Sequence, residues 1–240
     1  MGQIMKKKPL IVIPIATLLV AATVFGVLWF TRERPDYAGA LSYVSEILKT
    51  KDTITTFISS ADNFDLENLP TTALDGFKSA AAQVTSYYES LSASTAMRDE
   101  NVKERYSNLE DLPKTLTKIL DTQALLTNFI EKTATSGYAS ASNELAALKS
   151  SSITFISTLG ADLDAYFAQV AAFSEKYQNA KSDQYDAMLQ AQVALAAAGK
   201  DLETKYANAS FEDIFDVAPT TIKDHFDQLK NFESYLKEKS

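Results

Sequence analysis

The sequence predicts an all-α protein in which one N-terminal transmembrane helix precedes an antiparallel bundle of about six helices. Two observations support this prediction: an uncharged apolar run near the N-terminus, and apolar stripes with helical spacing through the rest of the 240 residues. Alternating apolar and polar residues, which are typical of strands, do not extend over any useful length. The connecting segments also resemble one another, and one interpretation of this resemblance is a repeated helical hairpin.

The apolar run covers residues 9–31, none of which is charged. Its central 21 residues, 10–30, would form a helix of roughly 31 Å, which matches the hydrocarbon thickness of a bilayer. The apolar region of a cleaved signal peptide is shorter, so the favoured interpretation is an uncleaved signal anchor, although Ala38-Gly39-Ala40 leaves cleavage open as an alternative. The anchor residues are Lys6, Lys7, Lys8, Leu10, Ile11, Trp29 and Phe30.

The charges that flank the run predict its orientation. Three lysines precede it, whereas two arginines with Glu33 between them follow it, so the positive-inside rule places the N-terminus in the cytoplasm. Residues 1–8 are then a short cytoplasmic tail, 9–31 the anchor in the cell membrane, and 32–240 an extracytoplasmic domain. The lipid bilayer is the first predicted partner.

The apolar stripes of the remaining chain predict helices near 36–61, 70–93, 111–135, 138–179, 182–208 and 219–238. The fourth helix is unusually long, and Gly160 is the expected position of a kink or a break within it. The clearest stripe has alternating spacings of three and four, as in a helix–helix seam. It consists of Leu74, Phe77, Ala81, Val84, Tyr88 and Leu91. In helix 182–208 the expected seam is Tyr185, Leu189, Gln192, Leu195, Leu202 and Tyr206.

Two connecting segments resemble each other at an offset of 149 residues. Lys51, Asp52, Pro70, Thr71, Thr72, Asp75 and Phe77 match Lys200, Asp201, Pro219, Thr220, Thr221, Asp224 and Phe226. One interpretation is a duplicated helical hairpin, with copies at 36–93 and 182–239. The alternative is that Pro, Thr and acidic residues recur because helix starts favour them.

Composition excludes several classes of function. The chain has no Cys and a single His, which excludes disulfides, Cys zinc sites and multi-histidine metal sites. The net charge is −8, and without the five basic residues and one acidic residue up to Arg34 it becomes −12, from 18 basic and 30 acidic residues. Such an acidic chain is a poor general partner for nucleic acid, so none is expected.

No recognised catalytic motif is present, so no enzymatic activity and no cofactor are predicted. His225 could act as a base or a pH sensor, but an ordinary boundary residue is the preferred interpretation. Carboxylates cluster at two connectors and could hold Ca²⁺, but their spacing fits helix capping better. These clusters are Asp62, Asp65 and Glu67, and Glu212, Asp213 and Asp216.

Tyrosines off the main stripes give the candidate interaction surface, namely Tyr87, Tyr106 and Tyr138. Exposed tyrosines are common in recognition surfaces. The alternative is that they line the edges of the bundle with their hydroxyl groups in water.

The favoured function is therefore a membrane-anchored, extracytoplasmic helical interaction or scaffold protein of the cell envelope. Its expected partner is another envelope protein or a second copy of itself. The alternative is a small-molecule-binding or sensory ectodomain that acts through a partner membrane protein, because too little of the chain lies inside to signal alone.

Overall fold

The computed structural model describes residues 34–60, 71–178 and 184–240, with the side chains of 71 and 72 excepted. These residues form helices and short connections without a strand, which confirms the all-α prediction. The α-helices are α2 (Tyr37–Lys49), α3 (Lys51–Ser60), α4 (Thr71–Ala93), α5 (Glu100–Ser107), α6 (Asp111–Ser136), α7 (Ser142–Lys149), α8 (Thr154–Gln178), α9 (Tyr185–Tyr206), α10 (Phe211–Phe215) and α11 (Pro219–Lys239). Short 3₁₀ turns, η1 (Thr95–Arg98) and η2 (Tyr138–Ser140), precede α5 and α7.

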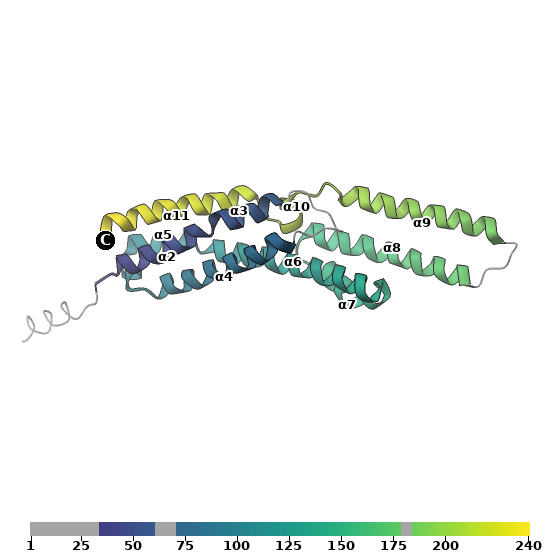
Figure 1. Cartoon of the computed structure of the whole chain (residues 1–240), viewed down its shortest axis with the longest axis horizontal. Helices are drawn as coiled ribbons and strands as arrows, with labels where there is room; N and C mark the ends of the chain where they lie inside the picture. The colour runs from purple at the N-terminus through teal and green to yellow at the C-terminus, as the bar shows by residue number, and fades with distance from the viewer. Residues whose placement is uncertain (1–33, 61–70, 179–183) are drawn as a thin grey trace, which may run out of the picture.

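The helices form an elongated bundle (Figure 1). At one end, α2 packs against α11 and α4, while α3 packs against α4 and α11. Helix α4 packs in turn against α6, and α6 contacts α7, which pairs with α8. Helix α9 packs against α8, and this pair projects from the other end of the molecule (Figure 1). Helices α11 and α9 follow one another along the long axis, which makes the molecule at least roughly 60 Å long.

The core lies in the first part of this array. All six residues of the α4 stripe are buried, as predicted, and so are Leu116, Ile119 and Leu126 of α6. The Phe57 and Phe77 rings stack with their centroids 4.3 Å apart, which joins α3 to α4. Short α10 buries Phe211 and Phe215 beside them, since the Phe57 and Phe215 ring centroids are 6.3 Å apart. Aromatic packing therefore joins α3, α4 and α10 in the middle of the bundle.

Two predicted helices are divided in the structure. The segment 36–61 is divided at Thr50, whose hydroxyl group donates to the Ile47 carbonyl at 2.7 Å. The segment 138–179 is divided into η2, α7 and α8, with the break at 150–153 rather than at Gly160. Gly160 lies inside α8, where a Cβ atom would come 2.7 Å from the Lys149 backbone nitrogen. This glycine therefore permits the close packing of α7 on α8 instead of ending a helix.

The predicted duplication does not correspond to a repeated hairpin. Residues 36–93 do form one, because α3 pairs with α4. In the second region, however, α9 pairs with α8 and α11 pairs with α2. Pro219 is the first residue of α11, which agrees with the interpretation of the shared residues as helix-start signals.

The predicted anchor residues, Lys6, Lys7, Lys8, Leu10, Ile11, Trp29 and Phe30, lie outside the described residues. Within the described ranges, none of the helices combines the length and apolar character that crossing a bilayer requires.

Candidate interaction surface

The three tyrosines predicted as an interaction surface lie on three different elements. Tyr87 of α4 packs towards Tyr43, with 6.3 Å between ring centroids, and Tyr106 of α5 packs on Tyr88 at 5.6 Å. Tyr138 of η2 stacks on Phe167 of α8 at 5.0 Å. Tyr106 precedes α6 and Tyr138 follows it, so a 26-residue helix of about 39 Å separates them. The structure thus does not bring the three together, and all are partly buried.

His225 is more buried than expected for a boundary residue, with 9% of its surface exposed. Its Nδ1 atom lies 2.8 Å from the Thr221 carbonyl oxygen, one turn earlier on α11. The hydrogen bond and the burial give this side chain a packing role.

The second acidic connector caps a helix, as expected, but that helix is the short α10, which was not predicted, rather than α11. The Ser210 hydroxyl group accepts from the Asp213 backbone N–H, and the Asp213 carboxylate accepts from the Ser210 N–H, forming a capping box. Asp216 ends the helix at a left-handed φ of 50° and pairs with Lys118 at 2.6 Å. The first cluster, Asp62, Asp65 and Glu67, lies outside the described residues. Among the described residues, no group of three or more acidic, His or Cys side chains is arranged to hold a metal.

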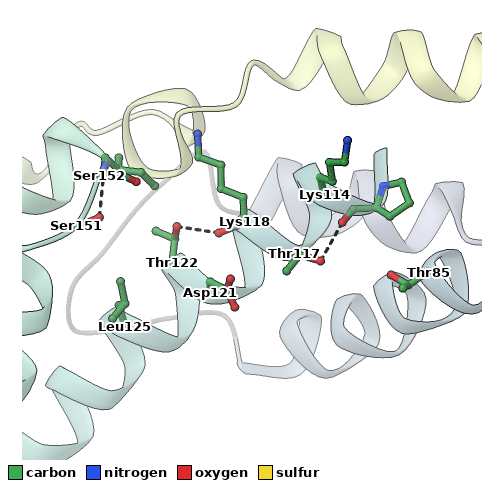
Figure 2. Close-up of a pocket in the computed structure, with 11 residues that line it drawn as sticks. Thr85, Lys114, Thr117, Lys118, Asp121, Thr122, Leu125, Ser151 and Ser152 are labelled. Atoms are coloured by element: carbon green, nitrogen blue, oxygen red, sulfur yellow. Dashed lines mark hydrogen bonds between the residues drawn. The ribbon is translucent and has the colours of Figure 1, made fainter. Parts of the chain in front are cut away.

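A shallow groove of about 550 Å³ lies between α4, α6 and the α7–α8 connection, lined in part by Thr85, Lys118 and Ser152 (Figure 2). Two of its threonine hydroxyl groups bond to their own helix: Thr117 donates to the Pro113 carbonyl at 2.9 Å, and Thr122 donates to the Lys118 carbonyl at 2.9 Å (Figure 2). No described lining residue has a buried polar side-chain atom without a hydrogen-bond partner. The groove therefore offers a ligand few free polar groups.

Exposed apolar side chains gather instead on the projecting pair of helices. Among the described residues, the large apolar side chains that are mostly exposed are Tyr177 of α8 and three on α9. Those three are Tyr185, Leu189 and Val193, with exposed fractions of 71%, 51% and 62%. We refer to residues 165–178 of α8 and 185–205 of α9 as the arm; none of these residues is buried. The arm therefore has an apolar surface that is exposed in the part of the chain that the structure describes.

Ionic contacts stabilise the base of the arm, where α8 near residue 162 meets the end of α9 near residue 205. Asp162 accepts from the Lys205 ammonium group and from the Tyr206 hydroxyl group, both at 2.5 Å, which ties α8 to α9. These two hydrogen bonds, with the lysine contributing most, lower the pKa of the Asp162 carboxyl group. Asp164 pairs with Lys149 of α7. The two carboxylates therefore pair with different helices, which agrees with their spacing of two residues along α8.

Beyond its base the arm has long segments without charge. Residues 165–174 of α8 and 187–199 of α9 contain no Asp, Glu, Lys or Arg. A helix that is apolar all round is normally buried in a protein interior or a membrane, and charged residues usually mark the solvent face of a surface helix. Here both segments lie on an exposed pair of helices, so the pattern indicates a surface that is suited to contact with another helix.

The opposite end of the molecule holds the start of the described chain. Thr95 of η1 donates to the Arg34 carbonyl at 3.2 Å and accepts from the Asp36 N–H at 3.0 Å. Beside it, Tyr37 donates to the Asp99 carboxylate at 2.7 Å, and this bond is the main cause that raises the pKa of Tyr37 to about 12. Residues 34–37 are therefore fixed to the bundle.

No protein-family model matches the chain, and comparisons with curated proteins and with solved structures found no significant match. The candidate surface thus stands on the geometry described above. Sequence reasoning missed it because it assigned Tyr185 and Leu189 to the helix seam; the available signal was the absence of charge over 187–199.

Proposed function

We propose that the protein is a membrane-anchored, extracytoplasmic scaffold of the cell envelope that works by protein–protein contact through the arm, without catalysis. The observation that carries this proposal is the gathering of exposed apolar side chains on the arm, at the end of the molecule opposite residue 34. With the predicted anchor joined at residue 34, the bundle would hold the arm away from the membrane.

The firm attachment of residues 34–37 supports this function. A flexible linker would let the bundle tumble, whereas the hydrogen bonds of Thr95 to Arg34 and Asp36 join the entry of the chain to the body of the bundle. Two further bonds to Asp99, from Tyr37 and from Tyr235 of α11 at 3.2 Å, connect the first and last helices there. The arm would therefore be presented at a defined height.

The alternative, a small-molecule-binding or sensory ectodomain, would use the groove between α4 and α6. Ligand pockets are usually enclosed and carry a few convergent polar groups. The hydroxyl groups of Thr117 and Thr122 are already engaged with their own backbone, and Lys118 is paired with Asp216. Contact through the arm is therefore the better-supported function.

Site-specific photocrosslinking in native membranes tests the proposal. A photoreactive residue replaces Leu189 on the arm or, as the control, Gln228, an exposed residue of α11. We expect membrane-associated adducts from position 189 and few from position 228. Equal yields from the two positions, or a chain recovered wholly in the soluble fraction, would contradict the proposal.

A further inference from the structure

We propose that the partner of the arm is the arm of a second copy of this chain, anchored in the same membrane. The two α8–α9 pairs would pack side by side into a four-helix arrangement, with α9 against α9. Leu189 and Val193 of one copy would then meet the same residues of the other. This inference rests on the proposed function, since it identifies the partner of the same surface.

The arrangement of α9 supports a helix–helix contact. Tyr185, Leu189 and Val193 are four residues apart, so each lies about 40° further round the helix than the one before and together they form a ridge. Met188, Leu195 and Leu202 are half-buried and lie on the face that meets α8. The ridge is thus a second apolar face of the same helix, beside the one that α8 covers.

Charge restricts contact between two copies to the arm. The exported part of the chain has a net charge of −12, so two copies repel each other over most of their surfaces. Contact between the charge-free segments 165–174 and 187–199 removes no charged group from water, which avoids the main cost of burying a polar interface. A lipid surface fits less well, because helices that lie on membranes usually carry Lys or Arg along the polar face.

The contact area that the arm offers is small, which is why the proposed dimer depends on the membrane anchor. Thirteen charge-free residues of α9 span about 20 Å, and one helix about 10 Å wide gives a face on the order of 200 Å² per copy. Stable interfaces bury about 800 Å² per partner, so this contact alone is weak. Holding both copies in one membrane raises their effective concentration and also aligns the arms at the same height.

Within one arm, α8 and α9 run antiparallel, and this geometry allows the arms of two copies to dock side by side with the same orientation. Asp162 pairs with Lys205 at the base, and continuing from there places Tyr177 level with Leu189. Equivalent residues meet across a two-fold axis that runs along the arm. If copies in facing membranes met end to end, residue 189 of one copy would instead lie close to positions of the other copy that are not residue 189.

The absence of Cys makes the test direct, because any introduced thiol is unique. The full-length variant Val193→Cys is treated in native membranes with a short bismaleimide. The control is Ala194→Cys, an exposed neighbour about 100° further round the helix. We expect at least tenfold more crosslinked dimer from Val193→Cys than from Ala194→Cys.

A second variant separates contact from folding. Leu189→Glu in the Val193→Cys background places a charge on the ridge and should reduce the dimer at least tenfold. Because Leu189 is half-exposed, we expect the circular dichroism spectrum and the melting temperature to stay unchanged. Dimer yields that are equal for the two cysteine positions, or insensitive to Leu189→Glu, would overturn the inference.

Failure of the inference and failure of the proposed function give different results. If Val193→Cys forms no dimer while the photoreactive residue at position 189 still crosslinks to a different protein, the scaffold function stands and self-association is wrong. If position 189 gives neither product, both proposals are wrong.

Discussion

Replacing Gly160 with Ala tests the close approach of α7 to α8, which supports the base of the arm. The new Cβ atom would lie 2.7 Å from the Lys149 nitrogen and 2.9 Å from the Leu148 Cβ atom. Because one of these atoms belongs to the backbone, α7 must retreat by about 0.7 Å to restore ordinary contact near 3.4 Å. Such overpacking costs about 1–3 kcal/mol.

Helix propensity opposes this cost. Alanine in a helix interior is favoured over glycine by about 1 kcal/mol. The net loss is therefore about 0–2 kcal/mol. Because the contact involves a backbone atom that cannot move aside alone, we expect Gly160→Ala to lower the free energy of unfolding by about 1–2 kcal/mol, the upper half of that range. Gly199→Ala is the matched control, because its Cβ atom would meet only the Tyr166 side chain, nearest at the hydroxyl oxygen at 3.0 Å, which is the movable end of that side chain. That variant should gain up to about 1 kcal/mol.

Urea unfolding of the full chain in mild detergent, followed by far-ultraviolet circular dichroism, measures both variants. The two changes in the free energy of unfolding should have opposite signs and differ by about 2 kcal/mol. If Gly160→Ala were as stable as the parent, the packing of α7 on α8 would be looser than the structure has it, and the reasoning would be refuted.

Three further predictions concern the core, the base of the arm and the end of α10. Leu126→Asp puts a charge at a position that is 1% exposed and should cost at least about 3 kcal/mol, whereas Ala124→Asp on the exposed face should cost under about 0.5 kcal/mol, both measured by urea unfolding. The lowered pKa of Asp162 means that its contribution, about 1 kcal/mol, is present above roughly pH 4 and is lost as the pH falls through the folded-state pKa. Asp162→Asn should lose it at neutral pH and show no such acid dependence in unfolding curves recorded at a series of pH values. Asp216→Ala should cost about 1–2 kcal/mol because of the left-handed φ of 50°, while Asp216→Gly, which also lacks the exposed pair with Lys118, should stay within about 0.5 kcal/mol of the parent in thermal melts.

The seams of the main bundle could be predicted from sequence because a buried helix face repeats every three to four residues. The observed α4 and α6 begin and end within one residue of the predicted helices 70–93 and 111–135. Of the predicted α6 seam, Leu116, Ile119, Gln123 and Leu126 are buried as expected, whereas Ile130 is only half-buried. The bounds and buried faces of α4 and α6 could be predicted from periodicity because the neighbours of each helix cover one continuous apolar stripe.

The divisions of the long helices could not be predicted in the same way. Periodicity continues through Thr50, whose side chain bonds to Ile47 one turn earlier, so the stripe itself does not show the division. The signal for the break before α8 was present in the run Ser150-Ser151-Ser152, because serine hydroxyl groups compete with the helix backbone. Ser151 does so here, accepting from the Ile153 N–H at 3.2 Å.

Helix α9 shows why the candidate surface was the hardest part to predict. Its apolar residues occupy two faces, one with Leu195 and Leu202 and one with Leu189 and Val193, so more than one seam satisfies the spacing rule. Only tertiary packing shows that α8 covers the first face and leaves the second exposed. A helix needs one apolar face for each neighbour, and within the described residues α9 packs extensively against α8 alone. The ambiguity of the sequence and the exposure of the ridge therefore have the same physical origin, a second apolar face that no helix among the described residues covers.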